Sequence, residues 1–167
     1  MKKITLIGLF SLLGLTLAFA QAPLGKGGKQ LNAGLGFSGW GVPVYVGADF
    51  GVHQDITIGP KVSYRNYSYR ALGNKWDQSL IVLSFNGNYH FNTLFNMPSE
   101  WNFYAGLTLG YYIWSDLDDY ADARSSGIGL DAQIGGRYFF SDKFGVNLEF
   151  GGGTGTGGGS FGITIKL

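Results

Sequence analysis

The sequence predicts an all-β fold: an eight-stranded antiparallel up-and-down transmembrane β-barrel that follows an N-terminal signal peptide. Three observations lead to this prediction. Apolar and polar residues alternate with period two along most of the chain beyond residue 20, which is the pattern of strands with two different faces. Charged residues make up only 14% of the chain, whereas soluble domains carry about 25%. Glycine and aromatic residues are abundant, with 29 glycines among 167 residues and 16% aromatics.

The first 20 residues predict an export signal. They begin with two lysines after the initiator methionine, continue with an apolar run and end with Ala-Phe-Ala, which is the layout of a secretory signal peptide. A membrane-anchoring helix is the other interpretation, but the apolar run is short for a span and a cleavage pattern follows it. We therefore expect cleavage after Ala20, which divides the chain into a signal peptide (1–20) and one barrel domain (21–167).

Composition excludes several classes of protein. The chain contains no cysteine, so neither a disulfide framework nor a lipid-modified N-terminal cysteine is expected. Its net charge is only +1, which gives no indication of a nucleic-acid partner. The mature part has no second apolar run of about 20 residues, so no transmembrane helix is expected there.

Eight segments alternate strongly enough to be strands, and none of the segments between them has the pattern of an amphipathic helix. In chain order they lie near residues 29–39, 42–52, 55–66, 78–91, 101–114, 126–140, 143–151 and 159–167.

The three central segments show the alternation most clearly. One face is apolar and consists of Ile81, Leu83, Phe85, Tyr89 and Phe91, then Trp101, Phe103, Ala105, Leu107, Leu109, Tyr111 and Ile113, then Ile128, Leu130, Ala132, Ile134 and Tyr138. The other face is polar and includes Ser84, Asn86, Asn88 and His90, then Asn102, Tyr104, Thr108 and Tyr112, then Asp131, Gln133 and Arg137. Aromatic residues lie towards both ends of the apolar face with aliphatic residues between them, which is typical of the two interfacial girdles of a membrane barrel.

The connections predict the orientation of the barrel. Those at one end are mostly tight, at 53–55 and 141–143, with a longer one at 92–100. Those at the other end are mostly longer and polar or glycine-rich, at 67–77, 115–125 and 151–159, with a short one near 39–42. An even number of strands with short periplasmic turns and longer outer loops is the layout of an outer-membrane barrel. We therefore expect both mature termini in the periplasm and the longer loops outside.

Two soluble folds, a β-sandwich and a lipocalin-type barrel, also alternate. Both bury the apolar face and place charge on the other face. Here the polar face is mainly Gly, Ser, Thr, Asn and Tyr, with about one charge per strand, which is too few for a solvated exterior. Closure of a membrane barrel also explains the regular last strand, because lipid cannot form hydrogen bonds with an open edge.

The whole mature chain resembles the small eight-stranded outer-membrane barrels of Gram-negative bacteria, the OmpA/OmpX-like type. In that family the last strand is apolar at alternate positions to its end, as are Phe161, Ile163, Ile165 and Leu167 here; the last residue is commonly aromatic, and Leu167 departs from this. The resemblance implies location in the outer membrane, insertion by the barrel assembly machinery, contact with outer-membrane lipids and lipopolysaccharide, and no cofactor. It implies a non-enzymatic role in envelope structure or surface interaction. A narrow porin-like channel for small solutes is the alternative.

Seven charges fall on the inward face of their predicted strands. They are Asp49, Lys61, Arg65, Asp131, Arg137, Glu149 and Lys166. Eight strands enclose a space just wide enough for side chains, and a buried charge is costly unless it is paired. We therefore expect a luminal salt-bridge network that fills the barrel, in which Arg65, Arg137 and Lys166 pair with Asp49, Asp131 and Glu149.

Two predicted outer loops hold weaker candidates. The loop at 67–77 combines aromatic and cationic residues that suit anionic lipid headgroups: Tyr67, Tyr69, Arg70, Lys75 and Trp76. The loop at 115–125 holds four carboxylates that are weak candidates for a divalent cation: Asp116, Asp118, Asp119 and Asp122. Their spacing completes no calcium loop, and a solvated loop is the simpler interpretation.

No catalytic constellation is predicted. The two histidines, His53 and His90, both fall near the periplasmic end, one in a turn and one facing the lumen. Neither has a nucleophile or a third orienting group at a recognisable spacing.

Overall fold

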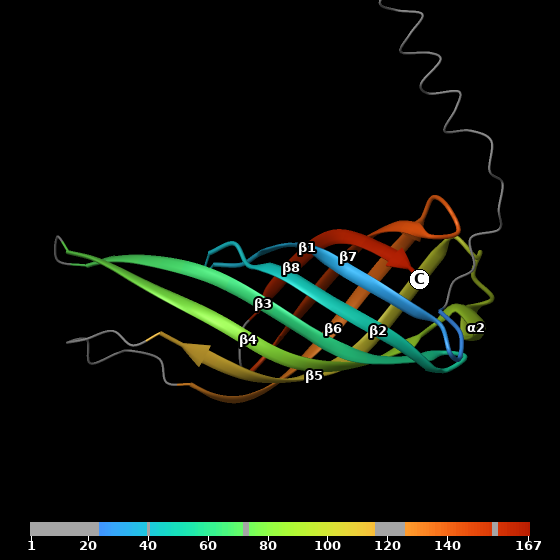
Figure 1. The fold of residues 1–167 in the computed structure, drawn as a ribbon, viewed down its shortest axis with the longest axis horizontal. Helices are drawn as coiled ribbons and strands as arrows, with labels where there is room; N and C mark the ends of the chain where they lie inside the picture. Colours follow the sequence, from blue (N-terminus) through green and yellow to red (C-terminus); the bar gives the residue numbers. More distant parts are fainter. Residues whose placement is uncertain (1–23, 40, 72–73, 116–125, 155–156) are drawn as a thin grey trace, which may run out of the picture.

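A computed structural model describes residues 24–39, 41–71, 74–115, 126–154 and 157–167, without the side chains of 67, 69–71 and 74–77. The predicted signal peptide lies outside these ranges and stays a prediction. The strands form one closed barrel in which each pairs antiparallel with the next and the last pairs with the first. Figure 1 shows the strands wound obliquely around a common axis, with the C-terminus at the end where a short helix lies.

The predicted all-β fold and the eight strands are confirmed. The strands are β1 (Lys29–Phe37), β2 (Val44–His53), β3 (Ile56–Ala71), β4 (Asn74–His90), β5 (Trp101–Trp114), β6 (Gly127–Phe139), β7 (Phe144–Gly153) and β8 (Gly158–Lys166). The described residues contain one helical turn that the alternation did not predict, α2 (Asn92–Phe95). None of the helical segments in the described ranges is long and apolar enough to cross a membrane.

Two predicted loops are shorter in the structure than the sequence predicts. Residues 67–71 and 74–77 continue β3 and β4 as a paired hairpin up to the Ala71–Asn74 pair, which projects beyond the other strands in Figure 1. Beyond the predicted strands 143–151 and 159–167, residues 152–153 and 158 also belong to β7 and β8, and Gly151 pairs with Gly158. In both cases pairing with a neighbouring strand overrides the local preference of polar residues and glycine for loops.

The predicted parity of the strands is confirmed by burial. Large apolar side chains on the outward face are exposed along every strand; Leu83, Leu107, Leu109 and Ile134, for example, are 48–63% exposed. Polar side chains on the inward face are buried, as are Gln30, Asn88, Asn102 and Thr164. An apolar exterior around a polar interior reverses the arrangement of a soluble protein, and it is the arrangement that hydrocarbon requires of a spanning barrel.

Strand length divides the wall into a tall side and a short side. The strands β3 to β6 span 13 to 17 residues, whereas β1, β2, β7 and β8 span 9 or 10. The tall strands extend at the end opposite the C-terminus (Figure 1). The described part of the lumen is therefore bounded at that end by a high wall on one side and by the glycine-rich ends of β7 and β8 on the other.

Candidate functional site: the barrel lumen

The half of the lumen near the C-terminus, named the periplasmic half after the orientation that the sequence predicts, is built around one buried carboxylate. Asp49 on β2 accepts a hydrogen bond from Arg137 Nη2 on β6 at 2.7 Å, and both side chains are only 4% exposed. The same carboxylate accepts hydrogen bonds from Gln30, Asn32 and Asn86 at 2.8, 2.9 and 3.2 Å. Three amides and one guanidinium thus surround the charge, which satisfies the condition under which a buried ion pair is tolerated.

A second group of buried polar residues lies next to this pair, towards α2. His90 is fully buried, its Nε2 lies 2.9 Å from Thr57 Oγ1, and its Nδ1 lies within hydrogen-bonding distance of the Asn102 amide. Arg137 Nη1 approaches Asn102 Oδ1 at 3.4 Å and so links the two groups. We call these residues together the periplasmic floor: Gln30, Asn32, Asp49, Thr57, Asn86, His90, Asn102 and Arg137.

A second ion pair crosses the middle of the barrel. Lys61 Nζ on β3 donates to Glu149 Oε1 on β7 at 2.7 Å, and the side chains are 26% and 18% exposed. Tyr104 donates to the other oxygen of Glu149 at 2.8 Å, and Tyr45 donates to Asn147 at 2.6 Å. The two tyrosine rings therefore span the lumen beside the pair.

Two inward glycines make room for these rings. A Cβ at Gly135 would lie 2.4 Å from Tyr104 Cζ, and a Cβ at Gly162 would lie 2.5 Å from the Tyr45 hydroxyl. Any larger residue would collide with a ring that the barrel already holds. The glycine content of the wall is in part the space that large luminal side chains need.

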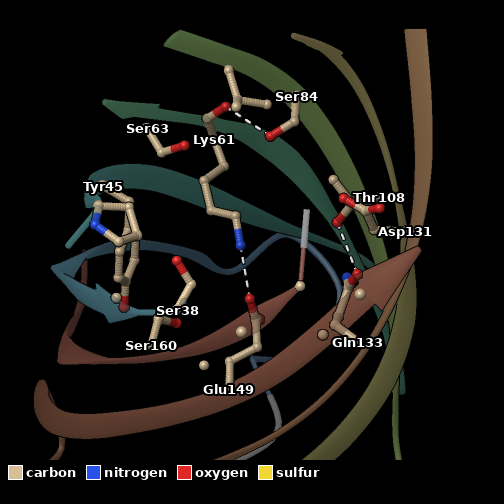
Figure 2. A pocket seen from close by; sticks show the side chains of 18 of the residues that line it. Ser38, Tyr45, Lys61, Ser63, Ser84, Thr108, Asp131, Gln133, Glu149 and Ser160 are labelled. Carbon is tan, nitrogen blue, oxygen red and sulfur yellow. Dashed lines mark hydrogen bonds and ion pairs between the residues drawn. The ribbon is translucent and has the colours of Figure 1, made fainter. Parts of the chain in front are cut away.

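The outer half of the lumen contains a cavity of about 130 Å³. Figure 2 shows hydroxyl and amide side chains around it, with the Lys61–Glu149 pair across its base. Thr108 donates to Gln133 at 2.8 Å on one wall, and the glycine-rich ends of β7 and β8 form another. A much smaller cavity of about 20 Å³ lies between the two ion pairs.

All seven predicted luminal charges have the inward parity of their strands, and each is buried or partly buried. The structure brings Arg137 to Asp49 and Lys61 to Glu149. The pairing predicted for Glu149 is therefore corrected, because Lys61 on β3 reaches it across the lumen from β7 instead of one of the three cations expected. The other three charges have further contacts. Arg65 donates to Ser38 Oγ at 3.1 Å, Asp131 accepts a hydrogen bond from Tyr112, and Lys166 Nζ lies 3.9 Å from the Phe139 ring centroid.

The inward face also carries an apolar cluster that the alternation does not predict. Leu80 and Val82 on β4 pack with Tyr112 and Trp114 on β5, and each is at most 9% exposed. The cluster belongs to the tall side of the barrel, above the polar layers. The signal was present, because Leu80 and Val82 have the inward parity of Ser84 and Asn86. The alternation is obscured there because residues 80–83 are all apolar, so the inward pair cannot be told from its outward neighbours.

The structure does not support a further site at the remaining candidate residues. The side chains of Tyr67, Tyr69, Arg70, Lys75 and Trp76 lie outside the described residues, as do Asp116, Asp118, Asp119 and Asp122. Within the described ranges, no three His, Asp or Glu side chains gather as metal ligands would. His90 is sealed from solvent between Thr57 and Asn102, an arrangement that suits a structural hydrogen bond better than proton transfer to a substrate.

No family model and no curated protein matches the chain. Solved structures do. The N-terminal β-barrel domain of Pseudomonas aeruginosa OprF is 12% identical with a TM-score of 0.60, over 86% of this chain and 99% of that one. The outer membrane protein OprG of the same species is 11% identical with a TM-score of 0.62, over 86% and 97%. Neisserial surface protein A is 17% identical with a TM-score of 0.59, over 84% and 95%.

These similarities show the fold. The chain has the architecture of small eight-stranded outer-membrane barrels over nearly the whole length of each neighbour. The fold and the exposed apolar exterior agree with the outer-membrane localisation that the sequence predicts.

Proposed function

We propose that this chain is a non-enzymatic outer-membrane barrel whose lumen is closed by its own side chains, and that it serves the envelope as a structural or surface-interaction protein. The observation that carries the proposal is the Asp49–Arg137 pair with its three amide donors. These groups fill the cross-section near the periplasmic end. A solute that crossed there would have to break several buried hydrogen bonds at once.

The sizes of the two cavities support a closed lumen. The 130 Å³ cavity in the outer half has room for a few waters, whereas the 20 Å³ cavity between the ion pairs holds about one. The free space therefore narrows from the outer half towards the periplasmic floor. A passage for ions needs a continuous file of water, and the arrangement of these side chains opposes one.

The proposal includes partners of three kinds. The exposed apolar belt suits outer-membrane lipid. The cationic and aromatic residues of 67–77 are predicted to contact the anionic headgroup of lipopolysaccharide. The apolar last strand suits recognition by the barrel assembly machinery. The proposed orientation is the one that the loop lengths predict, with both mature termini in the periplasm and the β3–β4 hairpin outside.

A narrow channel for small solutes is the second candidate, and the outer cavity favours it. Its walls carry hydroxyls, an amide and an ion pair, as the mouth of a polar pathway would (Figure 2). Transport would then require the Asp49–Arg137 pair to separate, so the two candidates differ in whether that pair holds in the membrane.

Conductance across a planar bilayer tests the proposal directly. We expect purified wild-type protein to give no steady conductance and Arg137→Ala to conduct, because the substitution removes the guanidinium that spans the floor. Lys61→Ala is the matched control, since it breaks an ion pair above an intact floor and should leave the barrel closed. Steady wild-type conductance that Arg137→Ala alters only in ion selectivity would replace the closed lumen with the channel.

A further inference from the structure

The periplasmic connection between β4 and β5 presents two large apolar side chains on a single helical turn. Leu94 and Phe95 of α2 are 62% and 66% exposed. An exposed apolar pair on a connection outside the strands has no explanation in the barrel itself. A contiguous exposed apolar patch marks a surface that another phase or molecule covers, so the surroundings of this pair decide its meaning.

The turn is held firmly against the barrel. Asn92 is 4% exposed; its Nδ2 donates to the Trp101 carbonyl at 2.6 Å, and its Oδ1 accepts from Asn102 at 2.7 Å. Thr93 donates to Asp55 at 2.5 Å in the neighbouring turn. Asn96 then ends the helix in a left-handed conformation with φ of 48°. Leu94 and Phe95 are therefore presented in a fixed position, not by a frayed end.

The exposed pair continues the aromatic girdle of the exterior. Tyr89 on the outward face of β4 contacts Phe91 with ring centroids 5.6 Å apart, and Phe91 contacts Phe95 at 5.8 Å. On the adjacent strands, Trp101 lies 4.8 Å from the Tyr138 ring. An unbroken file of rings thus runs from the lipid-facing wall onto α2.

The charge pattern favours lipid over water as the environment of this turn. Residues 91–99 include no Asp, Glu, Lys or Arg. Asp55, which accepts from Thr93, and Glu100 lie beside this segment but not within it. Exposed aromatic and aliphatic side chains partition to the boundary between hydrocarbon and headgroups. A docking site for a soluble protein would gain specificity from a charged or polar rim, and this segment supplies no charge for one.

We propose that α2 is a membrane-interface anchor, in which Leu94 and Phe95 insert among the phospholipids at the periplasmic surface of the outer membrane. The anchor fixes the depth of the barrel at the end where the termini lie. This inference depends on the barrel standing in a bilayer and is independent of whether the lumen is closed.

Site-specific labelling tests the proposal, because the chain has no cysteine and each introduced thiol is unique. Phe95→Cys carries an environment-sensitive fluorophore in phospholipid vesicles with brominated acyl chains. Leu109→Cys on the outward face of β5 is the lipid-exposed control, and Lys143→Cys in another periplasmic turn is the water-exposed control. We expect the label at 95 to show blue-shifted emission and quenching by brominated lipid closer to those of 109 than to those of 143, and protection from aqueous iodide.

Each other outcome overturns the anchor. Emission and iodide quenching like those at position 143 would place α2 in water. Protection from iodide without quenching by lipid would place it against protein, and dilution of the barrel in lipid would show whether that protein is a second copy. Leu94→Cys repeats the measurement one residue away, in case the label at 95 disturbs the contact with Phe91.

Discussion

The two halves of the lumen use the same kinds of residue in opposite ways. In the periplasmic half, Asp49 and Arg137 are 4% exposed and the carboxylate has four donors. In the outer half, Lys61 and Glu149 form a pair of the same length, 2.7 Å, but are 26% and 18% exposed at the base of a cavity of about 130 Å³.

The comparison indicates that packing, more than charge, decides how much free space a polar lumen keeps. Both ion pairs have good geometry, yet only the lower one is surrounded by amides that fill the remaining space. The upper pair borders glycines and small hydroxyl residues such as Ser63 and Ser160, which leave a cavity. A barrel of one diameter can therefore contain a densely packed floor and a larger outer cavity, depending on the volume of the inward side chains.

Access to a thiol reagent should separate the halves most strongly. Thr57 and Ser63 lie on the same face of β3, but Thr57 is 1% exposed within the floor and Ser63 borders the outer cavity. We expect Ser63→Cys to react readily with a small charged reagent added from outside, and Thr57→Cys to react at least about 100-fold more slowly, since it must wait for local opening. Equal rates, measured by mass shift over time, would mean that the floor admits water.

Removal of one cation from each half should give the next largest difference. Arg137→Ala leaves Asp49 buried without its counter-charge, at a cost of about 3 kcal/mol; this is the lower end of the usual range because three amide donors remain. Lys61→Ala should cost about 1 kcal/mol or less, because Glu149 is partly solvated and keeps the Tyr104 hydroxyl. Reversible urea unfolding in lipid vesicles measures both free energies. Similar losses of stability would remove the distinction between the periplasmic floor and the outer half.

The glycines should give the smallest but most local effect. Gly135→Ala places a methyl group against buried Tyr104 and should cost about 1–3 kcal/mol through overpacking. Gly152→Ala is its control at the outer rim, where the nearest atom to a new Cβ is Gly157 Cα at 3.5 Å, and it should change stability by no more than about 0.5 kcal/mol. The same unfolding experiment compares them. A larger loss for Gly152→Ala would show that the rim is the more tightly packed region.

Much of the wall could be predicted from the sequence because strand geometry has a period of two. Alternation alone assigns Leu107 and Leu109 outward and Thr108 inward, and burial agrees. The prediction failed where a residue has no strong preference of its own. Gly152, Gly153 and Gly158 are predicted as loop, yet they belong to β7 and β8. A one-turn helix such as α2 is too short to show a helical period, so the sequence does not predict that Leu94 and Phe95 lie on a helix.

The sequence by itself determined the strand number and the inward or outward direction of most side chains, and it predicted seven charges on the inward face. Only the tertiary structure decided which charges pair, because pairing depends on the stagger and tilt of strands far apart in the chain. Lys61 meets Glu149 across 88 positions, and Asp49 meets Arg137 across the same separation. A local pattern predicts which face a side chain lies on but not its height along the barrel axis. That height decides whether a residue belongs to the periplasmic floor or to the outer cavity.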